Sequence, residues 1–216
     1  MDSVERDENS SSQNDNFVER IIRGADGRCV VHFRNGSSFF VSDLDLADLE
    51  LTEGSIAAPE LLARLSRSAS LLEVESKALE LLARREHSRA QLAQKLIKRK
   101  FDRSIIDEVS EDFENRGYLD DFRFACLWID QRVRGHSEGL LKLRAGLSRA
   151  GISRRMIDEA IDESLSDSYE DEAFDRSVAT LEASGRRSVE SIVRRLHSLG
   201  FSSTKIRGYV ESRDTP

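Results

Sequence analysis

The sequence is poor in cysteine and has no long apolar run. Its 216 residues include two cysteines, Cys29 and Cys126, which lie far apart and lack the C-x-x-C spacing of a metal site. A disulfide framework is therefore not expected. No apolar run approaches the roughly 20 residues that a membrane span needs. The N-terminus has neither the basic region nor the apolar region of a signal peptide, so we expect a cytoplasmic protein that makes no membrane contact.

The sequence also lacks the short motifs of common catalytic and nucleotide-binding sites. It contains no G-x-x-x-x-G-K-[ST], G-x-G-x-x-G, G-x-S-x-G or H-E-x-x-H. The four histidines, at 32, 87, 136 and 197, are scattered, which is typical of surface or half-buried imidazoles. No cluster of titratable residues has the spacing for acid–base or metal chemistry. We expect a protein that is not an enzyme and that needs no cofactor.

Composition and charge indicate a helical protein with a large surface. Hydrophobic residues make up 38% of the chain and charged residues 34%, and prolines occur only at 59 and 216, so nothing interrupts helices between them. The net charge is −7, yet residues 77–108, 126–160 and 186–216 each carry more basic than acidic side chains. This pattern leaves two interpretations open, a mixed-charge surface or a basic face with a function.

The N-terminal quarter of the chain has a different character from the rest. Residues 1–16 are polar and acidic, which predicts a disordered tail, and residues 17–57 predict a small β-rich extension. Strand patterns cover 17–23, 28–34 and 37–41, with Asn35-Gly36 predicting a two-residue type I′ hairpin turn. The segment D-L-D-L-A-D-L-E-L, residues 43–51, is expected to include a short helix. Three strands alone are marginal, so the sheet should pack on a helix or serve as an appendage.

From about residue 58 onward the pattern is helical and repeats. Apolar residues spaced by 4, 5 and 5 positions occur three times, at Leu92, Leu96, Phe101 and Ile106, at Leu143, Leu147, Ile152 and Ile157, and at Ile192, Leu196, Phe201 and Ile206. Asp102, Ser153 and Ser202 are the expected N-caps of the helix that follows each turn. Just before the turn's apolar residue stand Lys100, Gly151 and Gly200. Glycine there suits a left-handed C-terminal residue, so Lys100 predicts a strained positive φ or a different turn.

A further helix precedes each of these pairs, at roughly 70–85, 120–134 and 168–184. The fold class is therefore mainly all-α, with three tandem three-helix repeats over 58–117, 118–166 and 167–216. The apolar stripes are expected to be core, and because each repeat is small, neighbouring repeats should help to bury them. We expect an elongated, curved solenoid preceded by the three-strand extension.

The stretch R-G-Y-L-D-D-F-R-F-A-C-L-W, residues 116–128, predicts the joint between the first two repeats. Gly117 should end one helix and Asp120 should cap the next, with Asp121 favoured by the positive end of the helix dipole. Leu119 and Phe124 then occupy the two positions of a hydrophobic staple. Tyr118 belongs to the same motif. We expect the aromatic residues here to face the joint, although a binding surface is the alternative.

The sequence resembles the RecX family of bacterial recombination regulators over about residues 70–210. The similarity lies in A-L-E-L-L-A-R-R-E-H-S-R-A-Q-L-A-Q-K-L (78–96), R-G-Y-L-D-D-F-R-F-A (116–125) and L-S-R-A-G-I-S-R-R-M-I-D-E-A-I (147–161). No single motif is decisive, but their order and repetition are specific. Lys100 departs from the family, which usually has glycine there, and the acidic tail lies outside the family pattern.

The resemblance implies a protein that binds the RecA recombinase, lodges in the groove of its filament on DNA, and reduces its ATPase, strand-exchange and co-protease activities. It implies single- or double-stranded DNA as a weak or filament-dependent partner, and we expect a monomer. An acidic protein with a pI of about 5.3 should bind naked DNA weakly, since phosphate neutralisation supplies most non-specific affinity.

A set of basic residues at similar places in the three repeats is the candidate binding face. It consists of Lys95, Lys98, Arg99, Lys100, Arg132, Arg134, Lys142, Arg144, Arg149, Arg194 and Arg195, with Arg186 and Arg187 nearby. Lys95 and Arg195 hold equivalent repeat positions. The alternative is that these cations only complement helix dipoles. Two other functions remain open: a DNA-binding module built from helix-turn-helix pairs, and a helical scaffold for another protein.

Overall fold

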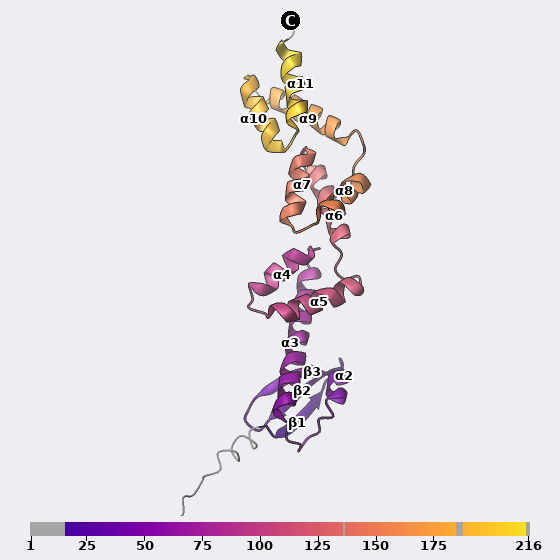
Figure 1. Ribbon diagram of the computed structural model, residues 1–216, viewed down its shortest axis with the longest axis vertical. Helices are drawn as coiled ribbons and strands as arrows, with labels where there is room; N and C mark the ends of the chain where they lie inside the picture. The colour runs from indigo at the N-terminus through magenta and orange to yellow at the C-terminus, as the bar shows by residue number, and fades with distance from the viewer. Residues whose placement is uncertain (1–15, 136, 185–187, 215–216) are drawn as a thin grey trace, which may run out of the picture. The chain divides into compact units, whose positions relative to one another are not determined.

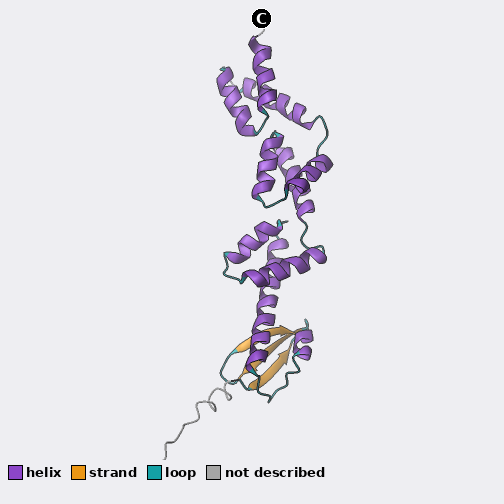
Figure 2. Cartoon of the chain, in the orientation of Figure 1, coloured by secondary structure: helices purple, strands orange, loops and turns teal. Residues whose placement is uncertain are grey.

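The computed structural model describes residues 16–214 except 136 and 185–187 (Figure 1). The tail expected at 1–16, apart from Asn16, lies outside these residues, as do Arg186 and Arg187. The described part contains one antiparallel sheet and ten helices (Figure 2). The strands are β1 (Val18–Arg23), β2 (Arg28–Phe33) and β3 (Ser38–Ser42). The helices are α2 (Asp43–Asp48), α3 (Pro59–Leu82), α4 (Arg89–Ile97), α5 (Arg103–Asn115), α6 (Asp121–Gly135), α7 (Leu140–Arg149), α8 (Arg154–Ser164), α9 (Tyr169–Ala183), α10 (Val189–Leu199) and α11 (Ser203–Asp214).

The mainly helical fold class with an N-terminal three-strand sheet is confirmed. The described residues divide into two compact units, one formed by residues 16–81 with 96–109 and the other by 82–95 with 110–214. The boundaries predicted at 16, 57, 117 and 166, and the curved solenoid, stay predictions. Among the described helices, none is both long and apolar enough to span a membrane.

The sheet has the three expected strands in the order β1-β2-β3, but its second turn differs from the prediction. Gly36 has a φ of 85°, whereas Asn35 is not in the left-handed region, so the loop is not a type I′ turn. Instead Gly36 N–H donates to Phe33 O, and Asn35 Oδ1 accepts from Ser37 N–H at 2.8 Å. This is the longer loop in which an ordinary turn is followed by a left-handed glycine, and the Asn35 side chain stabilises it.

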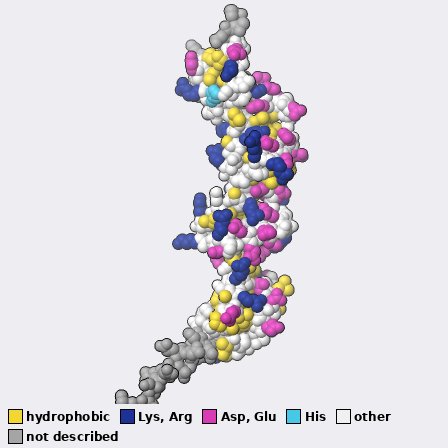
Figure 3. Space-filling model, viewed as in Figure 1, with side chains coloured by type: hydrophobic (Ala, Val, Ile, Leu, Met, Phe, Trp, Pro, Cys, Tyr) yellow, Lys and Arg dark blue, Asp and Glu magenta, His cyan; other side chains and the backbone are white. Residues whose placement is uncertain are grey.

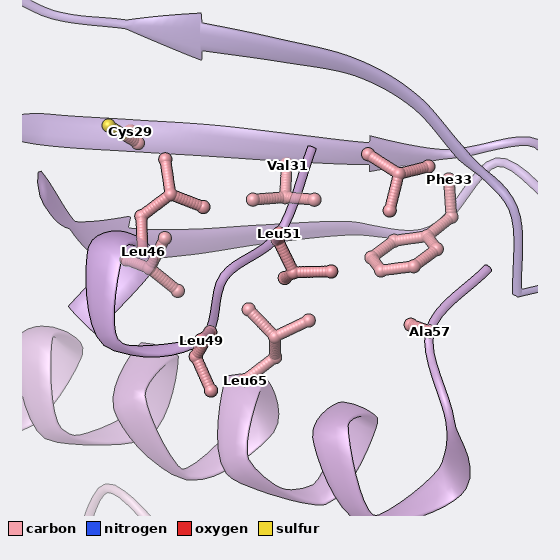
Figure 4. Packing of buried hydrophobic residues seen from close by; sticks show 10 residues of the cluster. Cys29, Val31, Phe33, Leu46, Leu49, Leu51, Ala57 and Leu65 are labelled. Carbon is pink, nitrogen blue, oxygen red and sulfur yellow. The ribbon is translucent and has the colours of Figure 1, made fainter. Parts of the chain in front are cut away.

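The core of the first unit lies between one face of the sheet and two helices. Cys29, Val31 and Phe33 alternate along β2 and are all buried, because residues two apart share one face of a strand. Figure 4 shows Leu46 from α2 and Leu65 from α3 pointing toward them. The expectation that the sheet packs on a helix is confirmed.

The helical part contains three successive sets of three helices, α3 to α5, α6 to α8 and α9 to α11. The first helix of the first set begins at Pro59 rather than near residue 70, so that predicted start is wrong. Leu65 is fully buried against the sheet, and Leu61 and Leu62 pack beside it. The early turns of α3 therefore gain their stability from the sheet and fall outside the repeat pattern.

The turn between the second and third helices is the same in every repeat. Lys100, Gly151 and Gly200 have φ values of 67°, 87° and 85°. In each turn the next residue's N–H bonds back five positions and the left-handed residue's N–H bonds back three, as in Ile152 to Leu147 O and Gly151 to Ser148 O. The positive φ predicted for Lys100 is confirmed, and the next helices are capped by Asp102, Ser153 and Ser202 as expected.

Candidate basic interaction surface

The joint motif has the local geometry that the sequence predicts. Gly117 has a φ of 73° and ends α5, while Tyr118 N–H donates back to Phe113 O at 2.9 Å. Asp120 caps α6, because its Oδ1 accepts from the N–H groups of Phe122 and Arg123 at 2.9 Å each. Leu119 and Phe124 stand at the two staple positions and both are buried.

Asp121 does more than complement the dipole of its own helix. Its Oδ1 accepts from Arg89 N–H at 2.7 Å, so one carboxylate at the start of α6 also holds the first amide of α4. Burial raises the pKa of Asp121, while the hydrogen bond and the charge of Arg89 act in the opposite direction. Arg89 in turn pairs with Glu114 at the end of α5. The joint is therefore a network that ties three helices together.

Arg123 completes this network and was not singled out from the sequence. Its Nε lies 3.0 Å from Glu86 Oε1, and its Nη1 and Nη2 donate to the carbonyl oxygens of Gly117 and Tyr118. The planar guanidinium thus binds a carboxylate and the exposed end of α5 together, which the single charge of lysine could not do. The signal that could have identified it is its position: a basic residue in the first turn of a helix, close to the carbonyl groups that end the preceding helix.

The aromatic residues of this stretch do not all face the joint. Phe124 belongs to the core formed by α6 and α8. The ring of Trp128 lies over Gly146 of α7, where a β-carbon would overlap it, and it also borders the core of the third repeat. Phe122 is 36% exposed. The expectation that the aromatics face the first joint is therefore wrong for Trp128, which packs on the other side of its repeat.

Several of the predicted basic residues are engaged in ion pairs inside the second repeat. Arg132 Nε lies 3.1 Å from Glu138 Oε2, and Lys142 Nζ lies 2.8 Å from Glu138 Oε1. Glu138 is only 3% exposed, so these two cations neutralise a buried carboxylate. Arg144 pairs with Asp158, and Arg134 lies 3.4 Å from Asp130 one turn away. Sequence analysis missed Glu138 because a single glutamate before a helix carries no distinguishing pattern.

Other predicted basic residues are exposed on the second helices or just after them. Lys98 and Lys100 follow α4, Arg149 ends α7, and Arg194 and Arg195 lie on α10. Within the described part of the chain, none of these five forms an ion pair with a carboxylate. Lys98 and Arg149 hold equivalent repeat positions. Lys95 is half-buried and Arg99 is exposed, and both make side-chain interactions.

The equivalence of Lys95 and Arg195 does not extend through the second repeat. The matching position there is Gly146, and the space beside it is filled by the ring of Trp128. A cation could not occupy this place without displacing the indole. The structure therefore does not place one basic residue at the same point of all three repeats.

A groove of about 520 Å³ between α7 and α8 contains a further arginine that the sequence did not single out. Arg144, Ser148 and Arg154 line it together with Asp158. Arg144 is held by Asp158, whereas Arg154 is exposed and forms no ion pair with a described residue. On the face in Figure 3, Lys and Arg side chains occur in separate groups with Asp and Glu between them. On this face the basic residues form separate spots and no continuous stripe.

Nothing in the described residues resembles a metal centre. No group of three or more His, Cys, Asp or Glu side chains in this part of the chain could hold a metal ion. His87 is buried, its Nδ1 lies 2.9 Å from Arg85 O, and burial lowers its pKa.

Comparison with known proteins gives one consistent result. Models of the first and second three-helix domains of RecX match residues 76–111 and 120–161. The regulatory protein RecX of Chlorobium phaeobacteroides is 33% identical over 130 residues, which cover 60% of this chain and 86% of the relative. That of Halorhodospira halophila is 30% identical over 147 residues, covering 65% and 88%.

Solved structures agree on the fold. A crystal structure of regulatory protein RecX matches with a TM-score of 0.75 at 16% identity, covering 91% of this chain and 98% of the other. RecX from Lactobacillus salivarius matches with a TM-score of 0.57 at 17% identity, covering 68% and 98%. The repeated turn, the capped joint and these relatives lead to one conclusion: the chain belongs to the RecX family of regulatory proteins.

Proposed function

We propose that this protein is a non-enzymatic regulator that binds the RecA recombinase on single-stranded DNA, in the groove of the filament, and inhibits its ATPase, strand-exchange and co-protease activities. The observation that carries the proposal is membership of a family of regulatory proteins over most of the helical repeats. The chain also lacks the motifs of a catalytic site, which is consistent with action through binding.

The exposed basic spots support a filament as the partner better than bare DNA. Arg132, Lys142 and Arg144 are engaged with carboxylates, so fewer cations are available for phosphates than the sequence suggests. Lys98 and Arg149, which hold equivalent positions, are the residues that we expect to contact the filament first. A partner that offers both protein and phosphate surfaces needs only a few such contacts.

The experiment measures the DNA-dependent ATPase rate of the cognate RecA while this protein is added below one copy per recombinase. We expect inhibition at such ratios, and we expect the double variant Lys98→Glu with Arg149→Glu to need several-fold more protein. Arg155→Glu is the control for the Arg149→Glu half of this variant, because Arg155 lies in the same repeat as Arg149, is 84% exposed and pairs with its helical neighbour Glu159.

Two results would contradict the proposal. No inhibition at equimolar protein would exclude a filament regulator of this kind. Tight binding to free DNA that the double variant abolishes, with no separate effect on the recombinase, would instead favour the alternative of a DNA-binding helical module. The groove between α7 and α8, with Arg154 on its rim, is the feature that favours that alternative.

A further inference from the structure

The two edges of the N-terminal sheet differ in whether their backbone groups are paired. The outer edge of β1 is covered, since Val18 exchanges backbone hydrogen bonds with Gly54 and Ser55, and Glu53 Oε1 accepts from Ile21 N–H. Phe17 forms a bridge with Ile56 at the same edge. No described strand pairs with the outer edge of β3. An open edge presents unpaired N–H and C=O groups to any strand that can approach.

The register identifies which groups of β3 face outward. Phe33 N–H donates to Ser37 O, and Asp43 N–H donates to Gly27 O, both toward β2. In an antiparallel ladder the bonds alternate along the strand, so the odd-numbered residues between them also bond to β2. The N–H groups of Ser38, Phe40 and Ser42 therefore point away from the sheet.

None of the usual devices that protect an edge is present on β3. Its sequence S-F-F-V-S has no charge and no proline, and its register with β2 shows no bulge. Phe40 is 60% exposed. Beside the edge lies a groove of about 650 Å³, bordered by Phe39 and Phe40, by one face of α3 and by Phe101, so the chain's own helix does not fill the adjoining space.

We propose that this edge pairs with β3 of a second copy, antiparallel and about a two-fold axis at Phe40, to form one continuous six-stranded sheet. Such a dimer would replace the monomer that we expected from the sequence. In this register Phe40 lies opposite Phe40 of the other copy, and Ser38 lies opposite Ser42. Aromatic pairs and serine pairs are favourable across antiparallel strands, and no like charges meet. The isologous arrangement uses one patch twice, as closed dimers do.

The face of α3 beside the groove is complementary to itself in charge. It carries small residues, Ser66, Ala69, Ser70 and Ser76, together with Leu72 and the charged residues Glu73, Lys77 and Glu80. The two-fold axis makes the two α3 helices antiparallel, and in the proposed dimer Glu73 of each copy pairs with Lys77 of the other. Lys77 also pairs with Glu80 of its own helix, which holds its side chain on this face. This inference goes beyond the proposed function and does not depend on it.

The first test is the association state of the full-length protein, measured by sedimentation equilibrium over a wide concentration series. Ser38→Pro removes an outward N–H at the first residue of an edge strand, a position where proline is tolerated. We expect it to weaken dimerisation by about tenfold or more. Ser38→Ala is the matched control, because both variants lose the contact between Ser38 Oγ and His32 Nδ1 but alanine keeps the N–H.

A second pair of variants tests the side chains. Phe40→Lys places like charges opposite each other at the two-fold axis and should abolish the dimer. Ile22→Lys is the control. Ile22 is an exposed residue of β1, the strand at the opposite edge of the sheet from β3, so this change should leave association unchanged. Far-ultraviolet circular dichroism checks that each variant keeps its fold.

The register is tested by disulfide formation in a Cys126→Ala background. Directly opposite residues of this kind lie about 5.5 Å apart between Cα atoms, within disulfide range. A mixture of Ser38→Cys and Ser42→Cys proteins should cross-link on mild oxidation. Ser38→Cys alone should not, because its two copies would lie about 13 Å apart, four residues along the strands.

Two outcomes overturn the proposal. A protein that remains monomeric throughout the concentration series, with no cross-link in the mixture, excludes this dimer. The open edge would then be a site for an extended peptide of another protein. A dimer that Phe40→Lys and Ser38→Pro do not weaken is formed by another surface. RecA inhibition is not a readout in any of these measurements, so their failure leaves the proposed function untouched.

Discussion

Lys100 adopts a backbone conformation that is unfavourable for a residue with a β-carbon. It adopts a φ of 67° at a turn where the two later repeats have glycine. The left-handed region costs a residue with a β-carbon about 1–2 kcal/mol, partly offset because glycine loses more entropy on folding. We expect Lys100→Gly to raise the free energy of unfolding by about 0.5–1 kcal/mol.

Urea denaturation measures this change, and Lys98→Gly is the control. Lys98 has no positive φ, so glycine there brings only the entropic cost and should lower stability by roughly 0.5–1 kcal/mol. Equal effects of the two substitutions would show that the turn at Lys100 is not strained.

At Asp121, the contributions of the hydrogen bond and of the negative charge to stability can be measured separately. Burial raises its pKa, so the folded state binds the proton more tightly than the unfolded state does. Its stabilising contribution is complete below the unfolded pKa of about 3.9 and declines as the pH rises through the folded value. Asp121→Asn keeps an acceptor for Arg89 without the charge, so its stability relative to wild type should increase between about pH 4 and neutrality.

The matched variant Asp121→Ala removes the acceptor as well. Relative to Asp121→Asn, it should lower the free energy of unfolding by about 1 kcal/mol at every pH, because neither variant titrates at this position and the Arg89 amide loses its partner only in the alanine variant. Denaturation series at several pH values measure both variants. A pH-independent difference between asparagine and wild type would contradict the raised pKa.

At the scale of elements, close packing between the second and third repeats depends on one glycine. Gly139 N–H donates to Leu199 O at 2.8 Å, and a β-carbon on Gly139 would overlap the carbonyl oxygen of Gly200. Its φ of −74° is allowed for any residue, so alanine would be excluded by the neighbouring turn alone. We expect Gly139→Ala to destabilise the protein by about 2 kcal/mol or more.

Gly135→Ala is the same substitution without the contact. Gly135 ends α6 and a β-carbon there meets nothing within 4 Å, so alanine should be neutral or stabilising by about 0.5–1 kcal/mol. Thermal unfolding of the two variants measures the difference. Similar melting temperatures would mean that the packing at Gly200 can relax to admit a methyl group.

What the sequence could predict was local, and what it missed depended on distant partners. The repeated turns and the caps at Asp120 and Ser153 follow from residues within a few positions of each other. The early start of α3 was missed because Leu65 packs on the sheet, outside the repeat pattern. Asn35-Gly36 misled because the Asn35 side chain stabilises a longer loop through Ser37. The contact of Trp128 with Gly146 joins separate helices and has no sequence signal.

The candidate site was the least predictable part. Charge alone could not separate Lys142, which neutralises a buried glutamate, from Arg149, which is exposed. That distinction depends on where Glu138 lies relative to two helices. The function assigned to the exposed residues stays a prediction.

At the scale of the whole molecule, net charge governs the response to nucleic acid. The chain carries −7, and several basic side chains are already paired with carboxylates. We expect weak binding to bare single-stranded DNA, because few basic side chains are available to contact phosphates. The affinity should decrease as the salt concentration rises, because each such contact releases a counterion. Fluorescence anisotropy with a labelled oligonucleotide at several salt concentrations measures this, and tight, salt-insensitive binding would contradict it.

The packing between repeats has a consequence for how such chains change length. Ser88 and Ala90, at the start of α4, contact Ala150 and Gly151, and Gly139 and Leu141, at the start of α7, contact the turn at Gly200 in the same way. The second repeat therefore has both surfaces of this contact. The start of α7 packs against the turn of the third repeat, and the turn at Gly151 packs against the start of α4. A gene duplication of that repeat alone would produce a segment that fits its neighbours on both sides, so chains of this kind can lengthen in steps of about fifty residues without a new interface having to evolve.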